Sequence, residues 1–252
     1  MNDNFLLRVN LIFTFLSQSS LQATEFIVDS PVPTPYEQVM MDINASVDHR
    51  KSGTGTRLPA LETQIGAYPD VQIRTVIPVA VLNAPKEKRS AYHYGDIGIG
   101  FKYRFLHETK WCPQAAFYPK FTLPSGVPEL GTGNKSWTGT VPFWLQKNWG
   151  SWSLTAGGGY LFNPAKHKYN YPFGGALLTK KVTERLTLGN ELFAQGPISL
   201  NNGSRLIYNF GGHYYFTPNT FILFSTGHSI AGAKTYVAFF GVGLTWGPKN
   251  PF

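Results

Sequence analysis

The sequence predicts an all-β protein: a closed antiparallel transmembrane β-barrel of about twelve strands, with short periplasmic turns and longer extracellular loops. Three observations predict this class. Apolar and polar residues alternate through repeated stretches, turn-forming residues separate these stretches, and the connections alternate between short and long. Alternation with a period of two places successive side chains on opposite faces of a β-strand. Aromatic residues make up 15% of the chain and enrich the apolar face, as is typical of a surface in contact with lipid.

The alternation is clearest in residues 95–105. There Ile97, Ile99 and Phe101 fall on one face, followed by Tyr103 and Phe105, while glycine and charged residues fall on the other. Residues 219–229 alternate poorly, and their faces stay unassigned. The predicted strands span residues 38–49, 57–67, 70–82, 93–107, 114–124, 136–148, 151–163, 169–181, 184–196, 205–216, 219–229 and 235–246.

The connections between these strands predict how the barrel lies in the membrane. In bacterial outer-membrane barrels, short turns face the periplasm and longer loops face outward. Both ends of the barrel chain are therefore expected on the periplasmic side of the bacterial outer membrane. Short turns are expected at residues 68–70, 148–151, 182–183 and 217–218, and longer loops at 50–56, 83–92, 125–135, 164–168, 197–204 and 230–234.

Alternation alone does not show which face points outward, because a soluble barrel hides its apolar face and a membrane barrel exposes it. The polar face consists mostly of Gly, Thr and Asn, so it has fewer charged residues than a surface in water usually has. A bilayer also requires closure, since open strand edges are not tolerated in hydrocarbon. We therefore favour contact with outer-membrane lipid, with a secreted soluble β-protein as the alternative. Aromatic residues near the strand ends support lipid contact: Tyr68, Trp111, Trp149, Trp152, Phe216 and Trp246 on one side, and Trp137, Phe162, Tyr171 and Tyr236 on the other.

The chain is expected to divide into three parts. Residues 1–23 are typical of a signal peptide, because Arg8 precedes a short apolar core, and cleavage is expected after Ser19 or Ala23. Residues 24–37 contain several prolines and are expected to be extended rather than to form a strand. We hypothesise that this segment enters the barrel as a plug. Residues 38–252 are expected to form the barrel.

Charge and cysteine content argue against several other classes. The net charge is +8, but the basic residues are not clustered on a helix or in an RNA-binding motif, so no nucleic-acid partner is expected. The single cysteine, Cys112, excludes an intramolecular disulfide and a multi-cysteine metal site. The histidines show no metal-ligand spacing. No metal and no cofactor are therefore expected.

The predicted outer loops are rich in basic residues. We expect these residues to face the phosphates of lipopolysaccharide, as basic segments bind anionic lipid; ordinary loop solubility is the alternative. The basic residues are Arg50, Lys51, Arg57, Lys86, Lys88, Arg89, Lys135, Lys166, Lys168, Arg205 and Lys234, against the acidic Glu87 and Glu129.

Charged residues on the polar face of the strands are the candidate pore-lining residues. Because both signs are present, they can pair across the lumen as a structural network or contact a solute. A barrel of about twelve strands lies between narrow, filled barrels and wide aqueous ones, so a narrow or partly plugged lumen is expected. The candidates are Asp42, Glu62, Arg74, Asp96, Lys102, Arg104, Lys120, Glu191 and His213.

Nucleophilic catalysis finds little support in the sequence. His228 and Ser229 are adjacent, but a catalytic pair needs spatial approach and a third orienting group. We expect no enzyme, and we expect a channel for the passive passage of small molecules. A structural or surface-binding barrel without transport is the alternative, followed by a membrane-embedded hydrolase that uses His213, His228 and Ser229.

The run from Gly95 to Glu108, GDIGIGFKYRFLHE, resembles the outer-membrane β-barrel family labelled "MetA pathway of phenol degradation". Pro113, the run Leu123-Pro124-Ser125-Gly126 and residues 184–192 resemble later parts of the family pattern, so the resemblance covers residues 57–246. It implies an outer-membrane transporter of small, aromatic or otherwise hydrophobic compounds, without a set of substrate-binding residues. Such a barrel also needs the barrel-assembly machinery, which often reads a terminal aromatic residue. Trp246 and Phe252 are the two candidates for that signal.

Overall fold

The structure is a computed structural model that describes residues 25–50, 53–85, 91–200 and 203–248. The expected signal peptide lies outside the described residues, as do Lys51, Lys86, Lys88, Arg89 and Phe252. Within the described part, one short 3-10 helix, η1 (Pro128–Leu130), occurs between strands. None of the helices in this part is long and apolar enough to span a bilayer.

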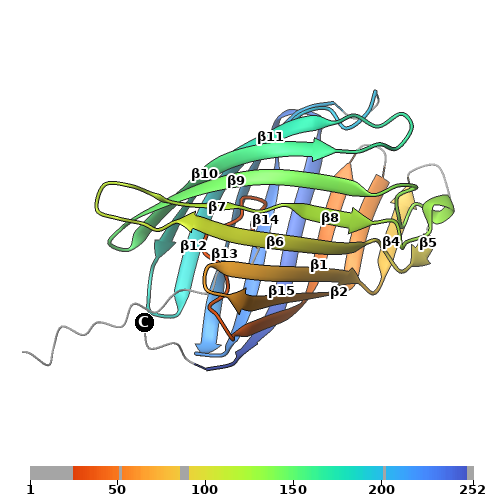
Figure 1. The fold of residues 1–252 in the computed structure, drawn as a ribbon. Helices are drawn as coiled ribbons and strands as arrows, with labels where there is room; N and C mark the ends of the chain where they lie inside the picture. The colour runs from red at the N-terminus through yellow and green to blue at the C-terminus, as the bar shows by residue number, and fades with distance from the viewer. Residues whose placement is uncertain (1–24, 51–52, 86–90, 201–202, 249–252) are drawn as a thin grey trace, which may run out of the picture.

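The described chain folds into a closed antiparallel β-barrel (Figure 1). Consecutive strands pair around the ring, and β1 closes it by pairing with both β2 and β15. Closure satisfies the backbone N–H and C=O groups, which find no water in hydrocarbon. The strands are β1 (Val39–Arg50), β2 (Gly53–Tyr68), β3 (Val71–Pro78), β4 (Val81–Pro85), β5 (Ala91–His93), β6 (Ile97–Leu106), β7 (Gln114–Phe117), β8 (Lys120–Leu123), β9 (Thr138–Trp149), β10 (Trp152–Phe162), β11 (Tyr171–Lys181), β12 (Leu186–Gln195), β13 (Arg205–Thr217), β14 (Thr220–Gly232) and β15 (Thr235–Trp246).

These strands occupy twelve positions around the barrel. Three positions are each filled by two short strands in succession. β3 and β4 both pair with β2, β5 and β6 pair with β4 and β3, and β7 and β8 share the place between β6 and β9. Each predicted strand span overlaps one of the twelve positions, so the predicted fold class is confirmed.

The two faces of the wall also follow the prediction. In β1, Met40, Asp42 and Asn44 point into the barrel and are at most 7% exposed, whereas Ile43, on the opposite face, is 60% exposed. A bilayer favours this arrangement because it presents the apolar side chains to lipid and keeps polar groups within the barrel. The apolar face of the barrel therefore lies toward lipid, as expected for a protein of the bacterial outer membrane.

The aromatic residues predicted to face lipid near the strand ends are exposed, with one exception. Nine of the ten residues are exposed at the surface: Tyr68, Trp111, Trp137, Trp149, Trp152, Phe162, Phe216, Tyr236 and Trp246. Tyr171 was wrongly placed among them, because it lines a cavity inside the barrel. It opens β11 on the same face as the buried Leu177, so the period of the strand directs it inward.

Apolar side chains also occur inside the barrel, which explains the irregular pattern of residues 219–229. Phe221 and Leu223 of β14 point inward, are completely buried and pack with Met40. Ile222 and Phe224 lie on the opposite face of the same strand, toward lipid. Because both faces are apolar here, periodicity in the sequence could not assign them.

Two of the predicted outer loops are wrong, because the structure extends strands through them. β1 continues to Arg50 and β2 begins at Gly53, so most of residues 50–56 are strand. Likewise β14 ends at Gly232 and β15 begins at Thr235, which leaves a short connection in place of a loop at residues 230–234. Polar residues in these stretches resemble loop residues because the inner face of the wall is itself polar. Basic residues in the extended strands can therefore face the lumen.

Candidate functional site

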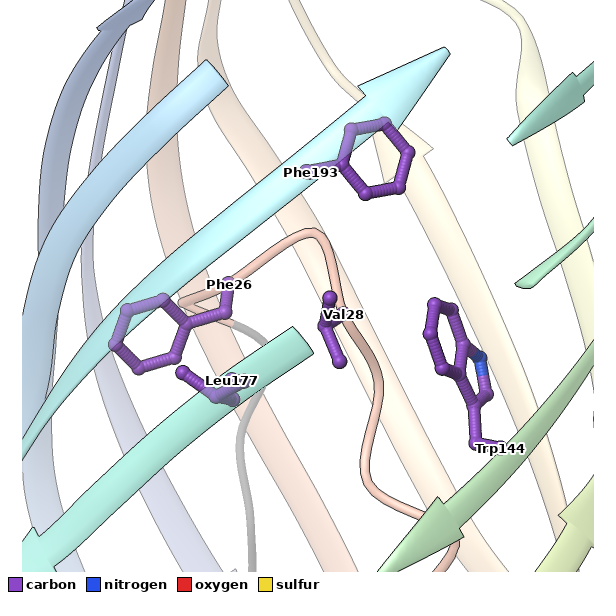
Figure 2. Packing of buried hydrophobic residues seen from close by; sticks show 5 residues of the cluster. All are labelled: Phe26, Val28, Trp144, Leu177 and Phe193. Atoms are coloured by element: carbon purple, nitrogen blue, oxygen red, sulfur yellow. The ribbon is translucent and has the colours of Figure 1, made fainter. Parts of the chain in front are cut away.

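Residues 25–37 enter the barrel, and we call this segment the plug. Its tip is deeply buried, since Phe26 is 8% exposed and Val28 is 3% exposed. Figure 2 shows these two side chains facing Leu177, Trp144 and Phe193 on the barrel wall. The chain therefore fills part of the lumen, as its sequence led us to hypothesise.

Side chains of the wall satisfy the backbone of the plug. Val28 N donates to Glu191 Oε1 at 2.5 Å, and Thr34 N donates to Gln72 Oε1 at 2.8 Å. A buried segment outside the sheet needs such partners, because each unpaired backbone group would cost free energy. The plug is thus held by individual side chains rather than by a ladder of strand hydrogen bonds.

Four of the nine candidate pore-lining residues contact the plug. Besides Glu191, these contacts are an ion pair of Lys120 with Asp29, a 2.9 Å approach of His213 Nδ1 to Glu25 Oε1, and a 3.4 Å hydrogen bond from Lys102 Nζ to Val32 O. All four side chains lie on the inner face, but in this structure they bind the chain's own segment. Their role in lining a passage for solutes stays a prediction.

The plug is fixed where it meets β2. Tyr36 forms a β-bridge with Gly66, and Glu37 N donates to Gly66 O at 2.9 Å. A Cβ on Gly66 would lie 1.8 Å from Pro35 O, so a larger residue would displace the segment. The sequence therefore needs glycine at this position for the plug to pass close to the wall.

Three further candidates pair with one another or with a turn. Arg74 Nη2 lies 2.6 Å from Glu62 Oε2 inside the lumen. Arg104 Nη2 lies 2.6 Å from Asp70 Oδ1 at the periplasmic end, where Asp70 belongs to the turn between β2 and β3. Asp42 is 2% exposed and also faces inward. Charges of opposite sign thus form ion pairs inside the barrel wall.

A cavity of about 880 Å³ lies between the plug and the outer end of the barrel. Glu25, Phe26, Ile27 and Asp29 of the plug line one side, and residues of the outer strand ends line the other. A volume of this size is in the range of small-molecule sites in proteins. The candidates that line this cavity are Glu62, Arg74, Asp96 and Lys120.

Asp96 anchors residues 124–137, which we call the outer loop. Its Oδ1 accepts a hydrogen bond from Gly126 N at 2.9 Å, and its Oδ2 accepts two from Asn134, at 2.7 Å from N and 2.9 Å from Nδ2. A Cβ on Gly133 would lie 2.6 Å from Asp96 Oδ1, so glycine allows the close approach. Thr132 and Asn134 line the cavity. The carboxylate therefore holds the outer loop against the mouth of the cavity.

Three cations expected on outer loops line the cavity instead: Arg50, Arg57 and Arg205. The pairing of β1 with β2 shifts between Asn44 and Ser46, so that β2 carries one extra residue and Arg57 stands opposite Ser46. Such a bulge reverses which residues of a strand face inward. The placement of these three arginines on outer loops is therefore wrong, because they lie in strands and line the cavity. Their contact with lipopolysaccharide stays a prediction.

The described residues bring together neither the proposed hydrolase set nor a metal site. His213 pairs with Leu223, whereas His228 pairs with Tyr208 further along β13. His228 is exposed, and its Nδ1 lies 3.2 Å from the backbone oxygen of Ser229 rather than from its hydroxyl. Within this part of the chain, no group of three or more His, Cys, Asp or Glu could hold a metal ion.

Solved structures with the same fold are outer-membrane proteins. The COG4313 outer membrane channel from Pseudomonas putida F1 superposes with a TM-score of 0.72 at 10% identity, covering 89% of this chain and 100% of that chain. The KdgM porin in complex with disordered oligogalacturonate gives a TM-score of 0.58 at 10% identity, covering 82% and 99%. The NanC porin gives 0.57 at 8% identity, covering 81% and 98%. At these identities the likeness shows the fold alone.

The family of the chain follows from its sequence. No curated protein matches it. The family described as "MetA-pathway of phenol degradation" matches residues 44–246, which is most of the chain and nearly all of the barrel. The resemblance first read from residues 95–108 is thereby confirmed. The chain belongs to this MetA-pathway family and forms a plugged twelve-stranded β-barrel.

Proposed function

We propose that the protein is a channel for the passive passage of small molecules, and that the plug limits its width. The observation that carries this proposal is the cavity of about 880 Å³ closed on one side by a segment that side-chain contacts hold in place. Twelve strands lie between barrels filled by side chains and barrels with a wide aqueous channel. The fold likeness to outer-membrane channels and porins supports the same function.

The cavity favours solutes that combine an apolar body with a polar group. Phe26, Phe173 and Phe193 contribute aromatic surface, while Glu62 and Arg74 contribute charge. A purely hydrophobic solute would displace water from these charged side chains without offering them a hydrogen-bond partner, which costs free energy. Aromatic compounds, which the family resemblance implies, fit the aromatic part of this wall. We therefore propose small aromatic or partly apolar solutes.

Refolding in detergent followed by planar-bilayer recording tests the channel function. A closed barrel is expected to migrate faster on a gel before heating than after it, because heat opens the strand ladder. The refolded protein is then expected to give discrete current steps of low conductance, since the plug narrows the lumen. A folded barrel without current steps would contradict the channel and favour the structural or surface-binding alternative. Loss of lipid or peptide turnover in His228→Ala would instead favour a hydrolase.

We also propose that lipopolysaccharide contacts the remaining basic residues at the outer end. Lys135, Lys166, Lys168 and Lys234 are exposed there, close to where headgroup phosphates lie. Changing these four residues to Glu is expected to weaken binding of lipopolysaccharide to the detergent-solubilised barrel several-fold. The matched control is Lys181→Glu, which reverses an exposed charge at the periplasmic end. Equal binding by all three proteins would leave ordinary solubility as the role of these lysines.

A further inference from the structure

Most cations on the cavity wall are already paired. Arg50 forms an ion pair with Asp48, which also lies 3.8 Å from Arg205 Nη2. Arg205 is further bound by Gln195 Oε1, at 3.0 Å from Nη2. Arg74 and Lys120 pair with Glu62 and Asp29 as described above. These cations therefore serve the internal network of the wall.

Arg57 differs from them. It lines the cavity and is exposed to it, and it forms no ion pair or side-chain hydrogen bond with any other residue that the structure describes. Gly55 shares the inner face of β2 with it, and a Cβ built there would meet no atom within 4 Å. The inward position next to Arg57 on β2 is therefore open, and both residues line the cavity. A planar guanidinium of this kind can bind a carboxylate through two parallel hydrogen bonds.

The nearby acids Asp48 and Glu62 act on this charge through space, but neither forms an ion pair with Arg57. Asp48 and Glu62 are held by Arg50 and Arg74, so each already has a cationic partner. The carboxylate of Asp96, which also lines the cavity, accepts three N–H groups of the outer loop. An anion that enters the cavity would therefore find Arg57 as a cation without an acid partner among the described residues.

The same cavity has an apolar wall. Phe173 and Phe193 line it with ring centroids 6.0 Å apart, and Ile207 and Phe26 line it as well. None of these four side chains carries a polar atom. The cavity therefore offers both an unpaired guanidinium and an aromatic surface to a small ligand.

We propose that Arg57 is an anion-binding subsite, which takes the carboxylate of a small organic acid while the apolar part of the acid lies against Phe173 and Phe193. This proposal rests on the proposed channel function, because it names the class of solute that the channel would take. Binding of that solute can be measured separately from its passage. A partly enclosed site strengthens the charge-assisted hydrogen bonds relative to bulk water. The site would thus concentrate carboxylates at the outer side of the plug.

Three probes separate the two halves of the site. Benzoate has both the carboxylate and the ring, benzamide keeps the ring without the charge, and acetate keeps the charge without the ring. Isothermal titration calorimetry on the detergent-solubilised barrel is expected to show tightest binding for benzoate. In bilayers, benzoate is expected to reduce the current carried by potassium chloride at lower concentrations than the other two probes.

Arg57→Gln is expected to weaken benzoate binding about tenfold, as loss of one good charge-assisted contact does. Benzamide binding should stay unchanged in this variant. The matched control is Lys135→Gln, which removes an exposed charge outside the cavity and should bind benzoate as the parent does. If Arg57→Gln does not refold, Arg57→Lys replaces it, and the loss of the two-pronged contact is still expected to weaken benzoate binding.

Equal benzoate affinity in the parent and in the Arg57 variants would overturn the subsite. Equal affinity of the parent for benzoate and benzamide would overturn it as well, because charge would then play no part. A barrel that binds benzoate through Arg57 but passes no current would refute the channel and leave the subsite standing. If the barrel conducts, but the Arg57 variants have the same conductance and the same benzoate affinity as the parent, the subsite alone is refuted.

Discussion

Deletion of residues 25–33 is expected to raise the single-channel conductance several-fold. This change removes the part of the plug that packs against Trp144 and Phe193 and leaves residues 34–37 attached to β2. The strand pairing that closes the barrel, β1 with β2 and with β15, involves none of the deleted residues, so the barrel should still refold. Water would then hydrate Glu191 and the other polar groups of the wall. Planar-bilayer recording measures the change directly.

A disulfide that ties the plug to the wall provides the matched control. A Cβ on Gly175 would lie 2.7 Å from Val28 Cγ2, so cysteines at these positions are close enough to bridge. The double variant Val28→Cys and Gly175→Cys, combined with Cys112→Ser to remove the native thiol, should conduct no more than the parent when oxidised. Reduction of the disulfide should return the conductance toward that of the parent, whose plug is not linked to the wall. Conductance that is unchanged by the deletion would show that the plug does not limit passage.

Asp96→Ala is expected to release the outer loop and to make the current both larger and more variable. The substitution removes three hydrogen bonds to a carboxylate, and each bond to a charged group contributes about 1.5–3 kcal/mol. Because about 1.4 kcal/mol corresponds to a tenfold change in an equilibrium, even part of this loss would greatly increase the open population of the loop. Limited proteolysis should cut residues 124–137 faster, and current recordings should show added fluctuations.

Glu129→Gln is the matched control for this prediction. Glu129 is an exposed acid in the same loop, within η1, so its substitution removes one negative charge without removing the anchor. Asp96→Asn should lie between the parent and Asp96→Ala, since an amide oxygen still accepts a hydrogen bond. Unchanged cleavage and current in Asp96→Ala would mean that the hydrogen bonds of Ser125 Oγ suffice to hold the loop. This hydroxyl accepts from Ile97 N at 2.8 Å and donates to Gly95 O at 3.2 Å.

The wall of the barrel could be predicted from the sequence because a bilayer requires apolar side chains on the outer face of every strand. Residues such as Ile43 and Asp42 must alternate between lipid and lumen, and this alternation is visible without any neighbour in space. Strand number, strand order and the outward apolar face all followed from that pattern. The pattern failed at Phe221 and Leu223, where the lumen is apolar as well.

The lumen was harder to predict because its geometry depends on contacts between distant residues. Arg57 was assigned to a loop, since nothing in the local sequence shows that the extra residue in β2 turns it inward. Gln72 and Gln146, which bind the plug through Thr34 and Ser30, are neutral residues of a kind found on any polar face. Proline content indicated that the N-terminal segment is not a strand, but which wall residues it binds is decided only by the closed barrel.

The bridge at Gly66 has a mechanical consequence. The chain is bound to Gly66 of β2 immediately before β1 begins. The plug is therefore attached to the wall at this end, near Pro35, and can move only about this point. Withdrawal of the plug together with β1 would break the pairing of β1 with β2 and β15. Rotation of the plug about this point would break only its individual contacts with side chains of the wall. Such a rotation would therefore break fewer contacts than withdrawal of the plug together with β1.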